Sequence, residues 1–253
     1  MTEARGRTAA IEARDDAATE AGKRVRALDW AAIETSLATR GYATTGRVLG
    51  AEECAALVAS YADDARFRSR VVMERHGYGR GEYKYFAYPL PAVVAGVREA
   101  LYAKLAPVAN RWMSALGRPT CYPAAHRAYL EQCHARGQTK PTPLLLRYGA
   151  GDYNCLHQDL YGDELFPLQA TFLLVEPDRD FRGGELCLTT SRPRRQSRVD
   201  VVPLLRGEGA IFAVRDRPEQ GARGYHKVTM RHGVSVLHSG ARTTLGIIFH
   251  DAQ

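Results

Sequence analysis

The sequence has 253 residues, of which 45% are hydrophobic and 25% charged, with a formal net charge of +7 at pH 7. This is ordinary globular composition, with ample length for a buried core. No stretch is apolar enough to span a membrane, and the first residues lack the apolar core of a secretory signal. We therefore expect a soluble, cytoplasmic protein with one large domain and an N-terminal extension.

The cysteines do not form a recognisable framework. Cys54, Cys121, Cys133, Cys155 and Cys187 are odd in number, scattered and never spaced as CxxC. This pattern argues against a structural zinc site and against a set of disulfides. We expect free thiols in a reducing compartment.

The positive charge is concentrated in two segments. From Arg192 to Arg231 there are ten Lys or Arg and four Asp or Glu, a net charge of +6. From Arg66 to Lys84 there are six against two, a net charge of +4. Such concentration favours a polyanionic partner such as nucleic acid. A solvated basic surface without a partner is the alternative, and the sequence leaves both open.

The N-terminal half is predicted to be mainly helical. Residues 1–26 are rich in Ala, Glu, Arg and Asp, which predicts a flexible arm, either a frayed helix or a disordered segment. Residues 27–140 form a predicted helical support region, because apolar residues recur there at helical spacing. The expected helices are Trp30–Thr39, Glu52–Tyr61, Pro91–Leu116 and Ala124–Ala135. The last two should buttress one side of a sheet.

The segment 66–89 interrupts these helices with alternating basic and aromatic residues and three glycines. Strand pieces around a mobile glycine loop fit it. It has the residues of a groove for single-stranded nucleic acid, in which cations bind phosphates and rings stack on bases. It also fits a lid over a barrel, the interpretation we favour, and a lid can itself contact substrate. The candidate substrate contacts are Arg75, Tyr78, Arg80, Tyr83 and Tyr85.

Short strands dominate residues 141–253. Apolar stretches rich in β-branched and aromatic residues alternate with turn residues, a pattern that predicts a sandwich or barrel. The expected strands lie at 143–148, 168–177, 185–190, 199–204, 209–214, 226–237 and 242–250.

The stretch RYGAGDYNCLHQD ends in two potential metal ligands, His157 and Asp159. Residues two apart in a strand or its extension point to the same face, so an imidazole and a carboxylate are aimed at one place. They are two of the three ligands in the 2-His-1-carboxylate set that holds non-haem Fe(II) and leaves positions open. His226, His232 and His238 are candidates for the third ligand.

A possible anchor for an acidic co-substrate follows these histidines. Arg242 lies ten residues after His232, and its planar guanidinium matches a carboxylate. Thr244 shares a strand face with Arg242 by the two-residue period, so its hydroxyl could be a second donor.

Together these motifs resemble the Fe(II)/2-oxoglutarate-dependent dioxygenases of the prolyl-hydroxylase-like branch. The GGE turn at Gly183 and the lead-in at Tyr148 are also similar, and the resemblance covers about Leu144–Asp251. More closely, LLLRYGAGDYNCLHQDLYG and HSGARTTLGIIFHDA resemble a bacterial family of predicted nucleic-acid-modifying oxygenases. The resemblance implies an α+β fold with a mainly β core. In this fold, residues 141–253 form a double-stranded β-helix of the jelly-roll or cupin type. The N-terminal helices pack against it and support it.

The resemblance also implies roles for individual residues. His157, Asp159 and His232 would be the catalytic Fe(II) ligands, Arg242 the 2-oxoglutarate anchor, and Thr244 and Tyr148 further co-substrate contacts. Tyr148 has an alternative role as an aromatic residue of the barrel wall.

The implied reaction consumes 2-oxoglutarate and O₂ at Fe(II) and releases succinate and CO₂. In this family the expected substrate is nucleic acid, whose damaged bases lose methyl groups oxidatively and must be flipped out or single-stranded to reach the iron. We expect no membrane association and no obligate protein partner. AlkB-type demethylases carry two arginines beyond the last histidine, whereas only Arg242 follows His232 here, as in prolyl hydroxylases. Hydroxylation of a protein side chain or a small molecule is therefore an alternative, and a non-catalytic cupin-like metal-binding module is a third.

Overall fold

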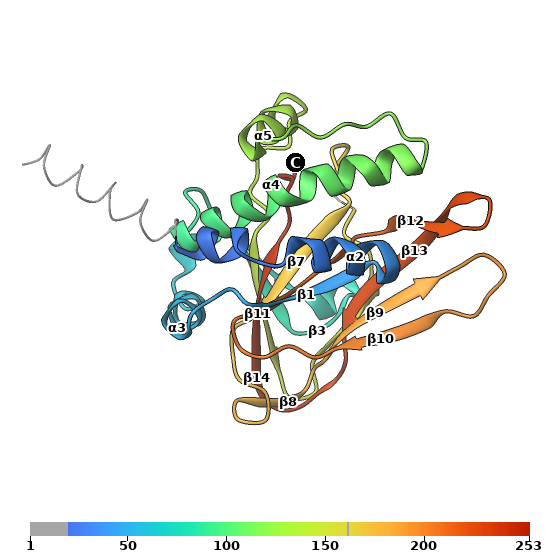
Figure 1. Cartoon of the computed structure of the whole chain (residues 1–253). Coiled ribbons are helices and arrows are strands. Elements are labelled where there is room, and N and C mark those ends of the chain that lie inside the picture. Colours follow the sequence, from blue (N-terminus) through green and yellow to red (C-terminus); the bar gives the residue numbers. More distant parts are fainter. Residues whose placement is uncertain (1–19, 161) are drawn as a thin grey trace, which may run out of the picture.

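The computed structural model describes residues 20–160 and 162–253, and Figure 1 shows two β-sheets with helices packed beside them. The labelled helices are α2 (Trp30–Arg40), α3 (Ala51–Ser60), α4 (Ala92–Ala115) and α5 (His126–Ala135), with short 3₁₀ turns η1 (Asp64–Arg66) and η2 (Met73–His76). The first strands are β1 (Tyr42–Arg47), β2 (Phe67–Val72), β3 (Gly79–Arg80), β4 (Glu82–Phe86), β5 (Leu144–Gly149), β6 (Tyr153–His157) and β7 (Leu168–Leu173). The later strands are β8 (Phe181–Gly183), β9 (Leu186–Ser191), β10 (Arg198–Val202), β11 (Glu208–Ala213), β12 (Asp216–Gly221), β13 (Gly224–Val234) and β14 (Leu237–Ile247).

Both sheets are antiparallel. The larger sheet has the strand order β1-β11-β7-β14-β5-β4-β2, with β8 paired to β14. The smaller sheet has the order β10-β9-β13-β6-β3, with β12 paired to β13. The predicted class, α+β with a mainly β core, is confirmed.

Helix α2 begins and ends where its flanking residues indicate. The Asp29 carboxylate caps it by accepting a hydrogen bond from the Ala32 backbone N–H at 3.0 Å. Gly41 ends it at a φ of 81°, which glycine adopts without a steric penalty. The helix packs on β1 and β11 and so covers part of the larger sheet (Figure 1). Within the described residues, no helix is long and apolar enough to cross a membrane.

Strand β13 shows how alternation places the functional residues. Val228, Met230 and His232 are buried, whereas Thr229 between them is half-buried and Arg231 is exposed. Successive residues of a strand face opposite sides of its sheet. His232 therefore belongs to the inner face of the smaller sheet, which looks toward the larger one.

The predicted N-terminal arm is wrong for its last residues. Residues 20–26 are helical, and Ala21 and Val25 are fully buried. Residues four apart share one helical face, so this short apolar pair is enough to hold the turn against the core. Residues 1–19 of the predicted arm lie outside the described residues.

The predicted lid over 66–89 is also wrong, because this segment forms part of the wall. Strand β2 pairs with β4, and β4 pairs with β5, so both extend the larger sheet. Strand β1 likewise joins that sheet beside β11. The helical support region and the β core therefore share one continuous hydrophobic core, and residue 140 is not a structural boundary.

Arg98 ties helix α4 to the residues that follow β14. Its side chain is 1% exposed, and Nε donates a hydrogen bond to the Ile248 carbonyl at 2.9 Å. Nη2 pairs with the fully buried Asp251 carboxylate at 2.9 Å. The Tyr88 hydroxyl donates to the same carboxylate at 2.9 Å. This network joins a helix of the first half to the end of the sheet.

Two buried histidines should make stability depend on pH. Burial lowers the pKa of His126 to about 3 and that of His250 to about 4, against about 6.5 for an unfolded histidine. Below about pH 6.5 the unfolded chain binds protons that the folded chain does not. We expect the free energy of unfolding to fall between about pH 6 and 4, by up to about 1.4 kcal/mol per pH unit for each histidine.

Urea unfolding at several pH values measures this slope. His126→Gln removes one titrating ring but keeps a donor for the Phe249 carbonyl, which accepts from the His126 ring at 2.8 Å. The slope of the variant should be smaller than that of the wild type. An identical slope would contradict the assignment.

Candidate active site

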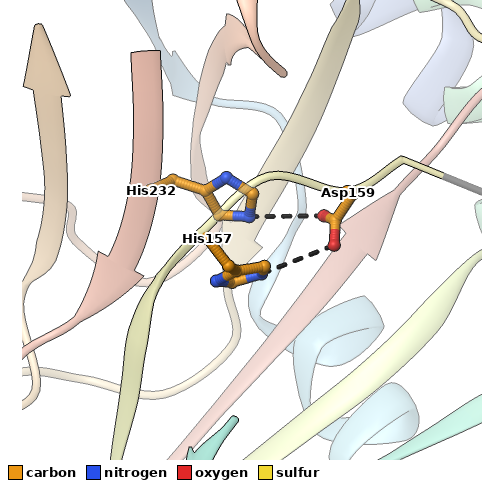
Figure 2. Close-up of side chains that lie close together, drawn as sticks. All are labelled: His157, Asp159 and His232. Carbon is orange, nitrogen blue, oxygen red and sulfur yellow. Dashed lines mark ion pairs between the residues drawn. The ribbon is translucent and has the colours of Figure 1, made fainter. Parts of the chain in front are cut away.

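Three side chains from three places in the chain meet between the sheets. His157 ends β6, Asp159 follows two residues later, and His232 on β13 is the direct antiparallel partner of His157. The Asp159 carboxylate lies 3.4 Å from Nε2 of His157 and 3.3 Å from Nε2 of His232. Figure 2 shows both rings turned toward this carboxylate. One ligand atom from each residue lies within 4.8 Å of the others, so the three can hold one metal ion.

The histidine rings are oriented to offer Nε2. Nδ1 of His157 donates to the Cys155 carbonyl at 2.7 Å, so Nε2 is the nitrogen directed at Asp159 and available to a metal ion. A carbonyl behind the ring is the usual orienting partner of a metal-bound histidine. Nδ1 of His232 is buried and has no partner among the described residues. The ring of His232 is instead packed against Phe212, with centroids 4.9 Å apart.

The electrostatics of the cluster favour the forms that bind metals. Burial alone would raise the pKa of Asp159, but hydrogen bonds and charge from the two histidines lower it well below its usual value. Burial lowers the pKa of His232 despite Asp159. Burial also acts to lower the pKa of His157, but Asp159 outweighs it and raises the pKa. Metal binding requires an ionised carboxylate and neutral imidazoles. Asp159 and His232 are already in these forms near pH 7.

Arg242 is a buried cation that lacks a carboxylate partner. It lies on β14 opposite Tyr148 of β5, and its side chain is 3% exposed. Nη1 has no hydrogen-bond partner among the described residues, and no ion pair of Arg242 is found there. Burial lowers the pKa of its guanidinium. Leaving a buried charge unpaired is costly, so this position fits an anionic ligand.

The second glycine before Glu185 makes room for Arg242. A Cβ at Gly184 would lie 3.0 Å from Cδ of Arg242 and 2.7 Å from Cδ1 of Leu237. Gly184 also has a φ of 66°, a conformation that disfavours other residues. The GGE turn therefore holds the stem of Arg242 in place.

The cluster and Arg242 face the same cavity of about 200 Å³. Thr244 and Tyr148 also line it, so the structure brings all the predicted cofactor residues together. The donor set suits a divalent metal with open positions, and the unpaired guanidinium suits the far carboxylate of a bound diacid. The site thus fits Fe(II) and 2-oxoglutarate.

The predicted substrate contacts separate into two groups. Tyr78, Tyr83 and Tyr85 line the cavity, and Tyr78 is 47% exposed at its mouth. Arg75 and Arg80 do not line it; both are exposed on η2 and β3 beside it.

The structure also separates the third-ligand candidates. His226 and His238 are exposed and lie outside the cluster that His232 completes. Sequence reasoning missed Gln169, whose Nε2 lies 3.1 Å from Nε2 of His232. Its only signal was a polar residue within the apolar strand LQATFL.

Residues 81–252 match the Oxygenase-NA family, described as an oxygenase catalysing oxidative methylation of damaged DNA. This chain belongs to that family. Two uncharacterised proteins of Mycobacterium tuberculosis, from strains CDC 1551 / Oshkosh and ATCC 25618 / H37Rv, are each 46% identical to the Oxygenase-NA chain over 167 residues. The alignment covers 66% of this chain and 72% of each relative. The predicted enzyme class, an oxidoreductase, is confirmed.

Two solved structures share the fold. A prolyl hydroxylase from Trichoplax adhaerens, in complex with a peptide of hypoxia inducible factor, has a TM-score of 0.52 and 12% identity over 88% of this chain and 89% of that one. An oxidoreductase of the 2OG-Fe(II) oxygenase family from Burkholderia pseudomallei has a TM-score of 0.50 and 14% identity over 88% and 91%. The predicted jelly-roll fold is confirmed. Fe(II), 2-oxoglutarate and O₂, the predicted cofactors, fit the cluster of His157, Asp159 and His232.

Proposed function

We propose that this Oxygenase-NA chain is an Fe(II)- and 2-oxoglutarate-dependent oxygenase that removes methyl groups oxidatively from damaged bases of nucleic acid. His157, Asp159 and His232 would hold the iron, and Arg242 would bind the far carboxylate of 2-oxoglutarate. The observation that carries the proposal is the convergence of these three ligands on a cavity that also contains a buried, unpaired guanidinium. The family description adds the class of substrate, damaged DNA.

The direction of the reaction follows from the chemistry of an oxygenase. Iron, 2-oxoglutarate and O₂ together supply an oxidant for a C–H bond. Oxidising an N-methyl group gives an N-hydroxymethyl group, which loses formaldehyde and leaves the unmethylated base. The protein contributes ligand geometry, the Arg242 clamp with Tyr148 and Thr244 beside it, and a cavity with many apolar lining residues.

The mouth of the cavity supports a nucleic-acid substrate. Tyr78 stacks on His76 with ring centroids 5.4 Å apart and an interplanar angle of 22°. Exposed aromatic rings are stacking surfaces for unpaired bases. Arg75, next to this pair, forms no ion pair within the described residues, so it is available to a phosphate. A reaction on cellular nucleic acid would take place in the cytoplasm.

Turnover against a substrate panel tests the proposal. The protein is loaded with Fe(II) and 2-oxoglutarate without oxygen, then exposed to oxygen with methylated oligonucleotides, peptides or metabolites. We expect methylated single-stranded oligonucleotides to stimulate the formation of succinate and formaldehyde in equal amounts. No stimulation by any methylated nucleic acid would overturn the proposal.

Hydroxylation of a protein side chain or a small molecule is the second candidate. Arg242 as the sole arginine beyond His232 favours it, since prolyl hydroxylases share this arrangement. Succinate stimulated by a peptide or metabolite, without formaldehyde, would select it. A bare metal-binding module is disfavoured, because such a module has no use for a buried cation aimed into its cavity.

Binding to single-stranded oligonucleotides should depend steeply on salt. Each phosphate contact contributes a slope of about −0.7 to the plot of log affinity against log salt concentration. Replacing Arg75 and Arg80 together with alanine should make the measured slope shallower by about 1.4 if both bind phosphates. The affinity of the metal-loaded variant for 2-oxoglutarate is the control. An affinity that does not change with ionic strength would contradict the predicted contacts of Arg75 and Arg80 with phosphates.

Arg242→Leu should weaken 2-oxoglutarate binding by at least about 100-fold. Two hydrogen bonds to a charged carboxylate contribute about 1.5–3 kcal/mol each. Calorimetry with the Mn(II)-loaded protein measures the affinity directly. Thr244→Val, which removes one hydroxyl from the same strand face, should cost about 10-fold or less. Equal effects of the two substitutions would contradict the role of Arg242 as the main anchor.

A further inference from the structure

Gln169 is a buried polar residue beside the proposed metal site. It lies on β7, in the middle of the larger sheet, and is 4% exposed. Its Nε2 is 3.1 Å from Nε2 of His232, and its Oε1 has no partner among the described residues. The side chain therefore reaches across the cavity from one sheet to a residue on the other.

The nitrogen that Gln169 contacts is the one required for the metal. Nε2 of His232 also lies 3.3 Å from the Asp159 carboxylate, so Asp159 and Gln169 share the single N–H or lone pair of this nitrogen. A metal ion bound there occupies the nitrogen, so the Gln169 amide loses this partner. Buried polar groups in proteins are nearly always hydrogen-bonded. The amide must therefore find another partner when the site is loaded.

The residues near Gln169 limit which atoms can become the new hydrogen-bond partner of its amide. Its register neighbour on β11 is Phe212, whose ring packs on His232 and offers no hydrogen-bonding atom. The cavity lining also contains Ala170 and Ile247, which are apolar, and Thr171, whose hydroxyl lies two residues along the same strand. The acceptors that enter this space with the metal are the oxygen atoms of 2-oxoglutarate.

We propose that Gln169 is a positioning residue for the co-substrate. Its side-chain amide donates a hydrogen bond to an oxygen atom of 2-oxoglutarate at the metal and so fixes which of the open positions the co-substrate takes. The inference rests on the proposed function, because it requires the metal to be held by His157, Asp159 and His232. It goes further by assigning a donor that the sequence motifs do not contain.

The test compares Gln169→Leu with Thr171→Val, which changes a second cavity-lining residue on the same strand. Three quantities are measured without oxygen: Fe(II) affinity in the absence of 2-oxoglutarate, 2-oxoglutarate affinity of the Fe(II)-loaded protein, and the visible absorption of the complex. For Gln169→Leu we expect unchanged Fe(II) affinity, 2-oxoglutarate affinity weakened about 10-fold or more, and a shifted absorption band. Thr171→Val should leave all three close to the wild type.

Each other result overturns the inference in a recognisable way. Unchanged 2-oxoglutarate affinity and absorption would mean that Gln169 only fills space. Fe(II) affinity reduced about 10- to 100-fold without 2-oxoglutarate would mean that the amide supports the metal ligands instead. If Gln169→Leu does not fold, Gln169→Glu replaces it in the test, because glutamate keeps the shape of the side chain but lacks the N–H donor. Gln169→Glu should weaken 2-oxoglutarate binding at least as much as we expect for Gln169→Leu. Wild-type protein that binds no Fe(II) would overturn the proposed function itself.

Discussion

Asp159→Ala should reduce substrate-dependent succinate formation to background. The substitution removes the single carboxylate of the cluster and leaves two neutral imidazoles to hold the metal. Residues that only orient metal ligands already contribute about 10- to 100-fold to metal affinity, so the loss of a ligand should exceed this range. Fe(II) affinity and succinate release, measured on the same preparation, report the two effects separately.

Matched histidine variants show whether this loss is specific to the cluster. His232→Ala should behave like Asp159→Ala, because its Nε2 lies 3.3 Å from the Asp159 carboxylate. His226→Ala and His238→Ala remove exposed imidazoles outside the cluster and should retain Fe(II) affinity. Full activity of Asp159→Ala, or loss of metal in His226→Ala, would remove the assigned residues from the ligand set.

Arg98→Met should lower the free energy of unfolding by about 3–5 kcal/mol. The Asp251 carboxylate is fully buried, and without Arg98 it would keep only Tyr88 and His134 as partners for its charge. Burial acts to raise the pKa of Asp251, but Arg98 and its hydrogen-bonding neighbours lower it. The variant also leaves the Ile248 carbonyl without its 2.9 Å hydrogen bond. Chemical unfolding at pH 7 measures the difference.

An exposed ion pair of the same helix provides the control. Arg111 of α4 pairs with Glu34 of α2, and their side chains are 58% and 42% exposed. Because solvent screens such a pair, Arg111→Ala should change stability by less than about 1 kcal/mol. The double variant Arg98→Met, Asp251→Leu should be more stable than Arg98→Met alone, since it no longer buries an unpaired charge. Equal decreases in the free energy of unfolding for Arg98→Met and Arg111→Ala would contradict the proposed contribution of the buried network to stability.

Local spacing explains why part of the site was predictable. His157 and Asp159 are two residues apart, and the two-residue period of a strand is enough to put both on one face. The residues alone left the third ligand open among three histidines, and only the family resemblance selected His232, because the choice depends on the register between β6 and β13. That register pairs His232 with His157, and no short-range pattern specifies it.

Prediction of the fold was limited in the same way, because contacts between distant strands cannot be inferred from local sequence patterns. Most strands after residue 141 were recognisable as apolar stretches bounded by turn residues, whereas β8 and the polar strand β12 were not expected. The sequence did not show that β1, β2 and β4 extend the larger sheet, since they join it through backbone hydrogen bonds that any residue can form. Gln169 was missed for a related reason. A single polar residue in a strand becomes informative only when the residue facing it is known.

Strand β14 lies in the middle of the larger sheet, with β7 on one side and β5 on the other, yet it follows every other strand in the sequence. During synthesis, β5 and β7 would therefore emerge from the ribosome long before the strand that joins them. Until then each presents an unpaired edge, which is the kind of surface that promotes association with other chains. The barrel should close only after β14 has been synthesised, and until then the nascent chain should depend on chaperones more than its final stability suggests.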